Sequence, residues 1–324
     1  MIRMFDTNGS EVFPGEDGAP APGQLVAWYD LENPTHEEEL RVEAALGLEV
    51  PSRDELRDIE PSSRLYTENG ALYLTLGVAY RSDTDFPDVT DVGFVLSADK
   101  LVSVRYADPR AFRLFTASLC RSHDGNGSRD ILTRLLETII DRTAEILEQA
   151  SRTADGVSAK VFSTGDDSHP DRATRDLEAT LVEIAQLQRL VAKARESLMS
   201  LARVASFLQA QAEFRTDKTL KERCRSISRD AQSLSEHATF ISGNIIFLLD
   251  ASLGLISVQQ NTIIKIFSIA AVVLLPPTFI ATIYGMNFHD MPELDWAYGY
   301  PVALGAMVVA ALLPYLWFRR KGWM

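Results

Sequence analysis

The residues best placed to do chemistry lie in a short polar loop between two apolar segments near the end of the chain. The loop opens with Tyr284-Gly285-Met286-Asn287-Phe288. The Asn287 carboxamide oxygen can accept hydrogen bonds from the water around a hydrated cation without stripping that water away. The carboxylates that follow could gather cations at this point, although a solvated loop explains them equally well; they are Asp290, Glu293 and Asp295.

The two apolar segments are each long enough to cross a membrane as a helix. The first covers residues 263–284 and is interrupted by Lys265 and Pro276-Pro277, and the second covers residues 298–318 without a charge. About 20 apolar residues span a hydrocarbon layer of about 30 Å. Because only residues 285–297 separate them, the segments are predicted to form a transmembrane hairpin.

The charges around this hairpin predict its orientation. Arg319-Arg320-Lys321 follow the second segment, whereas the connecting loop carries acids and no Lys or Arg. Basic residues next to a span favour the cytoplasmic side. We therefore expect both termini in the cytoplasm and the loop outside.

The first apolar segment carries a stripe of small or hydroxyl-bearing residues with two aliphatic interruptions. Counting by heptads from Asn261, as for a left-handed helical bundle, gives this stripe. Small residues allow helices to pack closely in lipid, so the stripe indicates either helix packing or the lining of a pore. The positions expected opposite the stripe, such as Phe267, Val273 and Phe279, are bulky. The members of the stripe are Asn261, Ile264, Ser268, Ala271, Leu275, Thr278 and Thr282, with Gly285 at its end.

Before the hairpin, the pattern predicts two further parts. Within residues 1–125, apolar and polar residues alternate as in strands, and turn residues predict hairpins around Glu68-Asn69-Gly70 and around residues 97–100. Strands combined with helices indicate an α/β domain. Residues 126–260 have helical periodicity and predict a helical hairpin and a stalk. The third helix continues from about Thr216 to Tyr284, so stalk and membrane span are predicted to be one helix of about 100 Å. Residues 261–324 form the membrane part.

Composition and motifs exclude several classes of protein. The formal net charge of −13 and the lack of a large basic face argue against nucleic acid as a partner. Cys120 and Cys224 lie in a cytoplasmic region, where a disulfide is not expected. There is no catalytic set, no His/Cys cluster with metal-ligand spacing and no phosphate-binding glycine loop. We therefore expect that the protein is not an enzyme and that it holds no tightly bound cofactor.

The loop residues resemble the signature of the CorA family of magnesium transporters. The resemblance rests on Tyr284-Gly285-Met286-Asn287-Phe288 together with Met291-Pro292-Glu293-Leu294, at the outer end of the penultimate span. Pro277-Thr278-Phe279-Ile280 and the closing Gly322-Trp323-Met324 fit the same pattern. It is specific over the last sixty residues and looser before them, where residues 28–34 and 53–66 are similar.

The resemblance implies a homopentameric channel in the inner (plasma) membrane, surrounded by lipid. Its substrate would be Mg²⁺, with Co²⁺ and Ni²⁺ as further divalent cations. Gly285, Met286 and a ring of Asn287 would form the selectivity filter, and the stripe would line the pore. Within the same superfamily, a Zn²⁺ transporter is the nearest alternative. A non-transporting, membrane-anchored metal sensor or scaffold is the alternative of a different class.

Regulation by cytoplasmic Mg²⁺ is also implied, with an acid of the stalk facing an acid of a neighbouring subunit. Counting back from Asn287, the stalk acid of the family pattern falls on Ser226, which is not a carboxylate. Glu222 and Asp230, one helical turn to either side, are the nearest candidates for this regulatory metal site, and both could equally be solvated surface charges.

Overall fold

The computed structural model describes residues 1–13, 25–58, 60–121, 127–163, 170–286, 291–292 and 296–323. It divides into two compact units. The first consists of residues 1–165 and 179–249, and the second of residues 166–178 and 250–324. Asn287, Asp290, Glu293, Leu294 and Asp295 lie outside the described residues.

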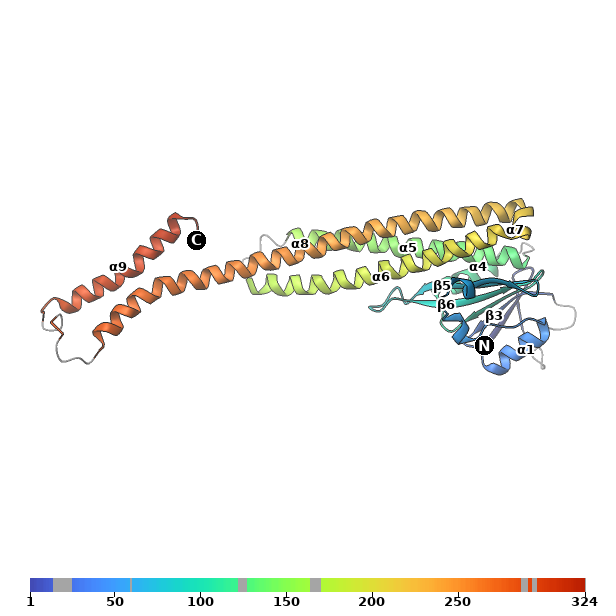
Figure 1. Cartoon of the computed structure of the whole chain (residues 1–324), viewed down its shortest axis with the longest axis horizontal. Helices are drawn as coiled ribbons and strands as arrows, with labels where there is room; N and C mark the ends of the chain where they lie inside the picture. The colour runs from blue at the N-terminus through green and yellow to red at the C-terminus, as the bar shows by residue number, and fades with distance from the viewer. Residues whose placement is uncertain are drawn as a thin grey trace. The chain divides into compact units, whose positions relative to one another are not determined.

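A seven-stranded mixed sheet forms the base of the first unit, in the order β2-β1-β3-β7-β6-β5-β4 (Figure 1). Neighbouring strands are antiparallel except for β3 and β7, which are parallel. The strands are β1 (Ile2–Asp6), β2 (Glu11–Val12), β3 (Val26–Glu32), β4 (Leu65–Glu68), β5 (Ala71–Tyr80), β6 (Asp88–Leu96) and β7 (Leu101–Arg105).

Both predicted hairpins are confirmed. Asn69 and Gly70 join β4 to β5 with positive φ angles of 50° and 79°, which is the geometry of a two-residue turn that favours Asn-Gly. Leu96 of β6 pairs with Leu101 of β7 around the second turn. The residues of the two turns therefore determine which residues of the adjoining strands pair.

Helices cover both faces of the sheet, as an α/β domain requires. On one face, α1 (His36–Leu46) and α2 (Arg53–Leu56) contribute Val42 and Leu56 to a core with Tyr29, and α3 (Pro61–Arg64) leads into β4. On the other face, Trp28 stacks on Phe5 at 4.7 Å and contacts Phe115 of α4 (Arg110–Leu119). Side chains alternate between the two faces, and the central strands are buried throughout.

A buried ion network holds β3, β7 and the start of α4 together. The side chains of Asp30 and Arg105 are 0% and 2% exposed, and Arg105 Nη2 lies 3.0 Å from Asp30 Oδ2. The Ser103 hydroxyl donates to Asp30 at 2.7 Å, and Arg105 Nη1 reaches Asp108 Oδ1 at 3.0 Å. Leaving a buried charge unpaired costs about 3–5 kcal/mol, so this network fixes the path of the chain from β7 into α4.

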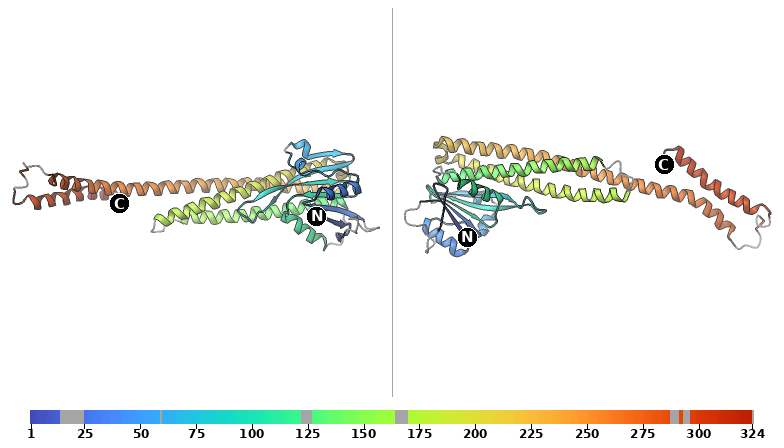
Figure 2. Two further views of the ribbon diagram at one scale, coloured as in Figure 1. Left: turned by 90° about the horizontal axis from the view of Figure 1, so that it is seen from below. Right: turned by 180° about the vertical axis from the view of Figure 1, so that it is seen from behind.

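Within the first unit, three long helices run side by side beside the sheet, and α1 lies on the opposite side of it (Figure 1 and Figure 2). They are α5 (Ser128–Ser163), α6 (Pro170–Ala210) and α8 (Lys218–Tyr284); the short α7 (Ala212–Thr216) precedes α8. Within the first unit, α8 buries a seam with heptad spacing, as in a coiled coil. Its residues are Leu220, Cys224, Ile227, Ala231, Ala238, Ile241, Ile245 and Leu248.

The predicted continuous helix is confirmed: α8 extends over 67 residues without a break. It passes from the first unit into the second, and Pro276 and Pro277 lie inside it. Polar contacts fix its first part, including a 2.8 Å hydrogen bond from Gln188 of α6 to Ser242. A single helix, α8, therefore contributes residues to both units.

The two cysteines should differ sharply in reactivity towards a thiol reagent. Cys224 is buried in the α8 seam, and burial, with a smaller contribution from Glu137, raises its pKa from 9.0 to about 12. Since only the thiolate reacts, its reactive fraction at pH 8 falls by about a thousandfold. Cys120 is exposed. In the detergent-solubilised full chain, maleimide should label one thiol per chain rapidly, and Cys120→Ser should remove this fast phase. Two equal fast phases would contradict the packing of α8.

Candidate functional site

The second unit contains the two helices that are long and apolar enough to cross a membrane, within the described part of the chain. They are the end of α8 and α9 (Gly299–Arg320). Most of their side chains are exposed in a single chain. These apolar surfaces therefore need either lipid or other protein to cover them.

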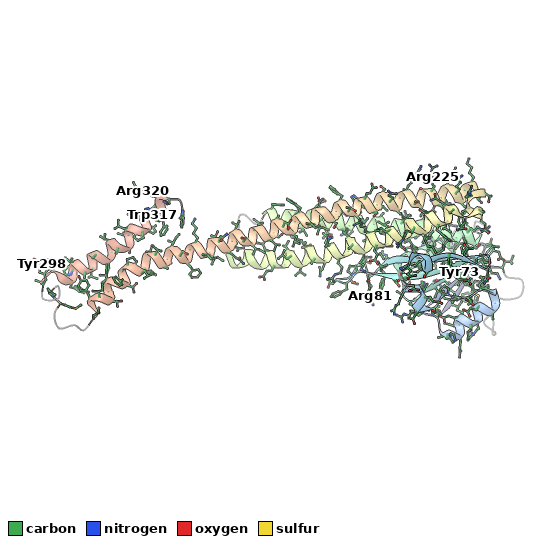
Figure 3. The ribbon with its side chains drawn as sticks, viewed as in Figure 1. Tyr73, Arg81, Arg225, Tyr298, Trp317 and Arg320 are labelled. Carbon is green, nitrogen blue, oxygen red and sulfur yellow. The ribbon has the colours of Figure 1, made fainter. Side chains whose placement is uncertain are left out.

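Aromatic side chains mark both ends of this hairpin, and basic side chains accompany them at one end. At one end Lys265 Nζ lies 5.7 Å from the ring centre of Trp323, and Lys321 Nζ lies 4.7 Å from that of Trp317. At the other end Trp296 and Tyr298 are in edge contact at 6.2 Å. Figure 3 shows Tyr298 at one end of α9 and Trp317 and Arg320 at the other. Such residues gather at membrane–water interfaces.

These ends define the part of α8 that fits the hydrocarbon layer. Residues 266–284 lie between Lys265 and the C-terminus of α8. At about 1.5 Å per residue they span about 28 Å, close to the thickness of a bilayer core. Asn261 lies more than one helical turn before Lys265, so it belongs to the aqueous side of this boundary.

The stripe predicted from the heptad count occupies one face of α8. At about 100° per residue its seven members fall within an arc of about 100°. All seven are exposed: Asn261, Ile264, Ser268, Ala271, Leu275, Thr278 and Thr282.

A different face of α8 is covered, on the side where Lys265 contacts the ring of Trp323, which follows α9. Ile269 is 5% exposed, and Lys265, Val273, Pro276 and Ile280 are partly covered. The centre of this covered face is about 130° around the helix from the centre of the stripe. The chain's own second span therefore leaves the stripe uncovered.

Of the three bulky residues expected opposite the stripe, only one lies there. Val273 is opposite, but Phe267 and Phe279 lie at the two edges of the stripe by the same count of about 100° per residue. Both are exposed, at 72% and 65%. Phe267 directly precedes a member of the stripe and Phe279 directly follows one. Heptad positions next to those of a stripe flank the stripe and do not lie opposite it, which explains why the expectation was wrong for these two residues.

The two threonine hydroxyl groups of the stripe donate to the helix itself. Thr278 Oγ1 donates to the Leu274 carbonyl, and Thr282 Oγ1 donates to the Thr278 carbonyl at 2.7 Å. Each oxygen keeps lone pairs that accept hydrogen bonds. The stripe thus presents acceptors, which suit the water shell of a cation.

The predicted filter begins where α8 ends. The Gly285 amide donates to the Ala281 carbonyl at 2.9 Å, and the Met286 amide donates to the Ile283 carbonyl at 3.2 Å. Met286 is 43% exposed. Of the predicted outer loop, Met291 is partly buried and Pro292 is exposed. The role of Asn287 stays a prediction, because it lies outside the described residues.

The two candidate regulatory acids are both exposed on α8, in the part of this helix that belongs to the first unit. Asp230 accepts a hydrogen bond from the Ser226 hydroxyl at 3.1 Å. Burial raises the pKa of Asp141 on α5, and the charges of Glu145 and Asp230 add to this. Glu222 has no comparable acidic neighbour among the described contacts. No three His, Cys, Asp or Glu side chains in the described ranges are arranged to hold a metal ion.

Asp250 is a candidate that the heptad count missed because the count began at Asn261. It is exposed and lies 11 residues earlier on α8, which puts it within about 20° of Asn261 around the helix. Extending the count backwards through the polar part of the helix would have found it. It adds a carboxylate to the aqueous end of the stripe.

Comparison with known proteins agrees over the whole chain. The family model described as CorA-like Mg²⁺ transporter protein matches residues 23–320. Proteins named magnesium transport protein CorA from Haemophilus ducreyi and from Escherichia coli (strain K12) are 32% and 35% identical to the chain, each over 100% of both sequences.

Solved structures confirm the fold class. The complete CorA magnesium transporter from Methanocaldococcus jannaschii covers 100% of this chain and 99% of its own, with a TM-score of 0.76 at 19% identity. The full-length CmaX protein gives 0.69 at 17% identity, with 98% and 96% covered. At such identities the likeness concerns the fold: a sheet-containing N-terminal domain, a long helix and a C-terminal helix. With its family match, full-length relatives and two apolar helices, the chain is a membrane protein that belongs to the CorA family of metal ion transporters.

Proposed function

We propose that this protein transports Mg²⁺ across the inner membrane. The observation that carries the proposal is the uncovered polar stripe on α8, in a chain at least 32% identical over its full length to proteins named for magnesium transport. Hydroxyl groups facing lipid would carry a cost. In a water-filled pore they would be useful, which favours transport over a non-transporting anchor.

One chain is too small for this pore, and we infer a homopentamer. A single α8 supplies one wall and one Asn287. Large apolar side chains are exposed on α8 before the membrane as well, including Phe240 at 64%, Ile246 at 51% and Phe247 at 61%. Contacts between copies of α8 would cover them. Five copies are what the family resemblance implies.

In this arrangement the Asn287 carboxamides form the selectivity filter at the outer mouth. Mg²⁺ loses its water reluctantly and usually keeps several water molecules when bound. Neutral carboxamide oxygens accept hydrogen bonds from those waters, whereas a carboxylate ring would hold the ion more tightly and slow its release. Gly285 allows a close backbone turn, and Met286 packs, because a thioether is too soft a ligand for Mg²⁺.

The remaining steps follow the stripe inwards. Ile264 and Leu275 form aliphatic rings that close the pore by excluding water. The hydroxyl oxygens of Thr278 and Thr282 lie between the filter and the Leu275 ring, and they accept hydrogen bonds from the water molecules around the ion. Co²⁺ and Ni²⁺, which also form hydrated divalent ions, are expected as further substrates. Zn²⁺ transport is the alternative within the same superfamily, and liposome uptake compared between Mg²⁺ and Zn²⁺ separates the two.

Cytoplasmic Mg²⁺ is proposed to close the channel. Each chain carries a formal net charge of −13, so several assembled copies repel one another. A divalent ion bound between acids of neighbouring subunits would relieve this repulsion and hold the ring closed. Because α8 continues from the stalk into the membrane, a shift of the stalk moves the pore wall directly.

Substitution of the filter residue tests selectivity. Asn287→Ala should abolish Mg²⁺ uptake into proteoliposomes while leaving assembly intact, because it removes the acceptor for the hydrated ion. Asn244→Ala, which removes an exposed carboxamide of α8 outside the stripe, is the matched control and should keep normal uptake. Normal uptake by an assembled Asn287→Ala variant would refute the filter assignment.

Substitution within the stripe tests the gate. Leu275→Ser should increase resting Mg²⁺ leak, since a hydroxyl wets the constriction. Leu274→Ser, at an equally exposed neighbouring position outside the stripe, should not. Unchanged leak in Leu275→Ser with retained flux would place the closure elsewhere, and Phe267 at the edge of the stripe would then be substituted next.

Limited proteolysis tests regulation. Millimolar Mg²⁺ should protect the stalk from protease and inhibit current, and Glu222→Ala or Asp230→Ala should weaken both effects. If cytoplasmic Mg²⁺ alters neither readout in the wild type, there is no such regulation. If both readouts respond but neither variant differs from wild type, the sensor lies at other residues.

A further inference from the structure

An arginine-rich cavity lies in the first unit, at the edge of the sheet. Its volume is about 580 Å³, within the range of small-molecule sites. The end of β5, the β7–α4 connection and α5 surround it. Arg81, labelled in Figure 3, follows the last residue of β5. The arginines that line the cavity are Arg53, Arg81, Arg110, Arg113 and Arg142.

The charge of this cavity is opposite to that of the protein. Five arginines line it against two aspartates, Asp83 and Asp108, a formal excess of three positive charges in a chain of net charge −13. Both aspartates already have arginine partners. Asp83 pairs with Arg110 at 3.3 Å and Arg142 at 3.0 Å, and Asp108 pairs with Arg113 at 3.3 Å.

Some of the positive charge is left without an acidic partner. Among the described residues, Arg53 and Arg81 make no ion pair, and their guanidinium groups stack on the rings of Tyr106 and Tyr80. Arg81 has a positive φ of 54°, an uncommon backbone state for a residue with a side chain. The side chain of Arg142 is 12% exposed, and its buried Nε has no hydrogen-bond partner within the described residues. Donors in such surroundings are poorly satisfied without an anion.

The walls of the cavity are held in place by the fold. The buried Asp30–Arg105 network fixes the chain from β7 to Asp108, and Arg142 donates to the Ser82 hydroxyl at 3.1 Å. A smaller cavity of about 200 Å³ adjoins it and shares Arg53, Tyr80 and Tyr106. An elongated anion could place its charged end among the arginines and the rest against the tyrosines.

We propose that this cavity binds a polyphosphate anion, such as a nucleoside triphosphate or an inorganic polyphosphate. Planar guanidinium groups recognise phosphate oxygens by paired hydrogen bonds, and several phosphates in a row match several arginines. The anion binds best when it carries no Mg²⁺, because Mg²⁺ neutralises two of its charges. This inference goes beyond transport and does not depend on it.

Calorimetric titration of the full-length protein in detergent, in EDTA and at low salt, tests the proposal. ATP and inorganic triphosphate are the probes, with adenosine and orthophosphate as comparisons. The expected result is saturable binding of both polyphosphates, weaker binding of orthophosphate and none of adenosine. Tighter binding of ATP than of triphosphate would identify a nucleotide as the ligand, and the reverse would identify an inorganic polyphosphate. Equimolar Mg²⁺ should weaken the binding.

The double variant Arg53→Ala/Arg81→Ala removes two positive charges without breaking an ion pair, and should weaken polyphosphate binding by about tenfold or more. Arg215→Ala/Arg225→Ala removes the same charge from exposed positions on α7 and α8 and should leave binding unchanged. An unaltered melting temperature without ligand checks the fold, and Arg110→Gln is the second variant if the first fails to fold. Absence of polyphosphate binding to the wild type, or equal loss in both double variants, would overturn the proposal.

Discussion

The account depends on one constraint: a polar helix face cannot remain against lipid without cost. The end of α8 carries hydroxyl and small residues along one face, and α9 packs on another face about 130° away. A monomer in a bilayer would leave Thr278 and Thr282 in hydrocarbon. In the proposed assembly, several chains around these faces remove that problem and create a polar path at the same time. Oligomerisation and transport then have the same physical origin.

The continuity of α8 gives the cytoplasmic part its significance. In the first unit this helix is held by a heptad seam against α5 and α6, and in the second it carries the stripe. Proline lacks a backbone N–H, so Pro276 and Pro277 interrupt the hydrogen bonds of α8 within its membrane segment. In the proposed gating, a shift of the stalk is transmitted along the helix as far as these prolines. The ion pairs of Arg105 hold β3, β7 and the β7–α4 connection together, so they stabilise the sheet of the same unit. In the proposed regulation, electrostatic repulsion between the acidic cytoplasmic parts supplies a force that bound cations alter.

Much of this could be predicted from the sequence because the signals are local. Asn69-Gly70 determines a hairpin, the apolar length of residues 298–318 determines a span, and the absence of breakers before Tyr284 determines the long helix. The stripe follows from the period of the helix. The side of α8 that α9 covers could not be predicted, since it depends on packing between segments. Phe267 and Phe279 were misplaced for another reason: the heptad count did not separate positions that flank the stripe from positions opposite it. The arginine cavity was missed for the same reason: its residues come from α2, β5, α4 and α5, far apart in the sequence.

The most direct measurement of the central claim is cysteine accessibility along α8 in a background lacking Cys120 and Cys224. Ser268 lies in the stripe, and its neighbour Ile269 is 5% exposed and covered by α9. If stripes from several chains surround a water-filled path, Ser268→Cys should react with a charged, membrane-impermeant thiol reagent, lose Mg²⁺ flux on reaction and form cross-links between chains with a short bifunctional reagent. Ile269→Cys should do none of these. Reaction and cross-linking at Ile269→Cys, with Ser268→Cys inert, would contradict the account.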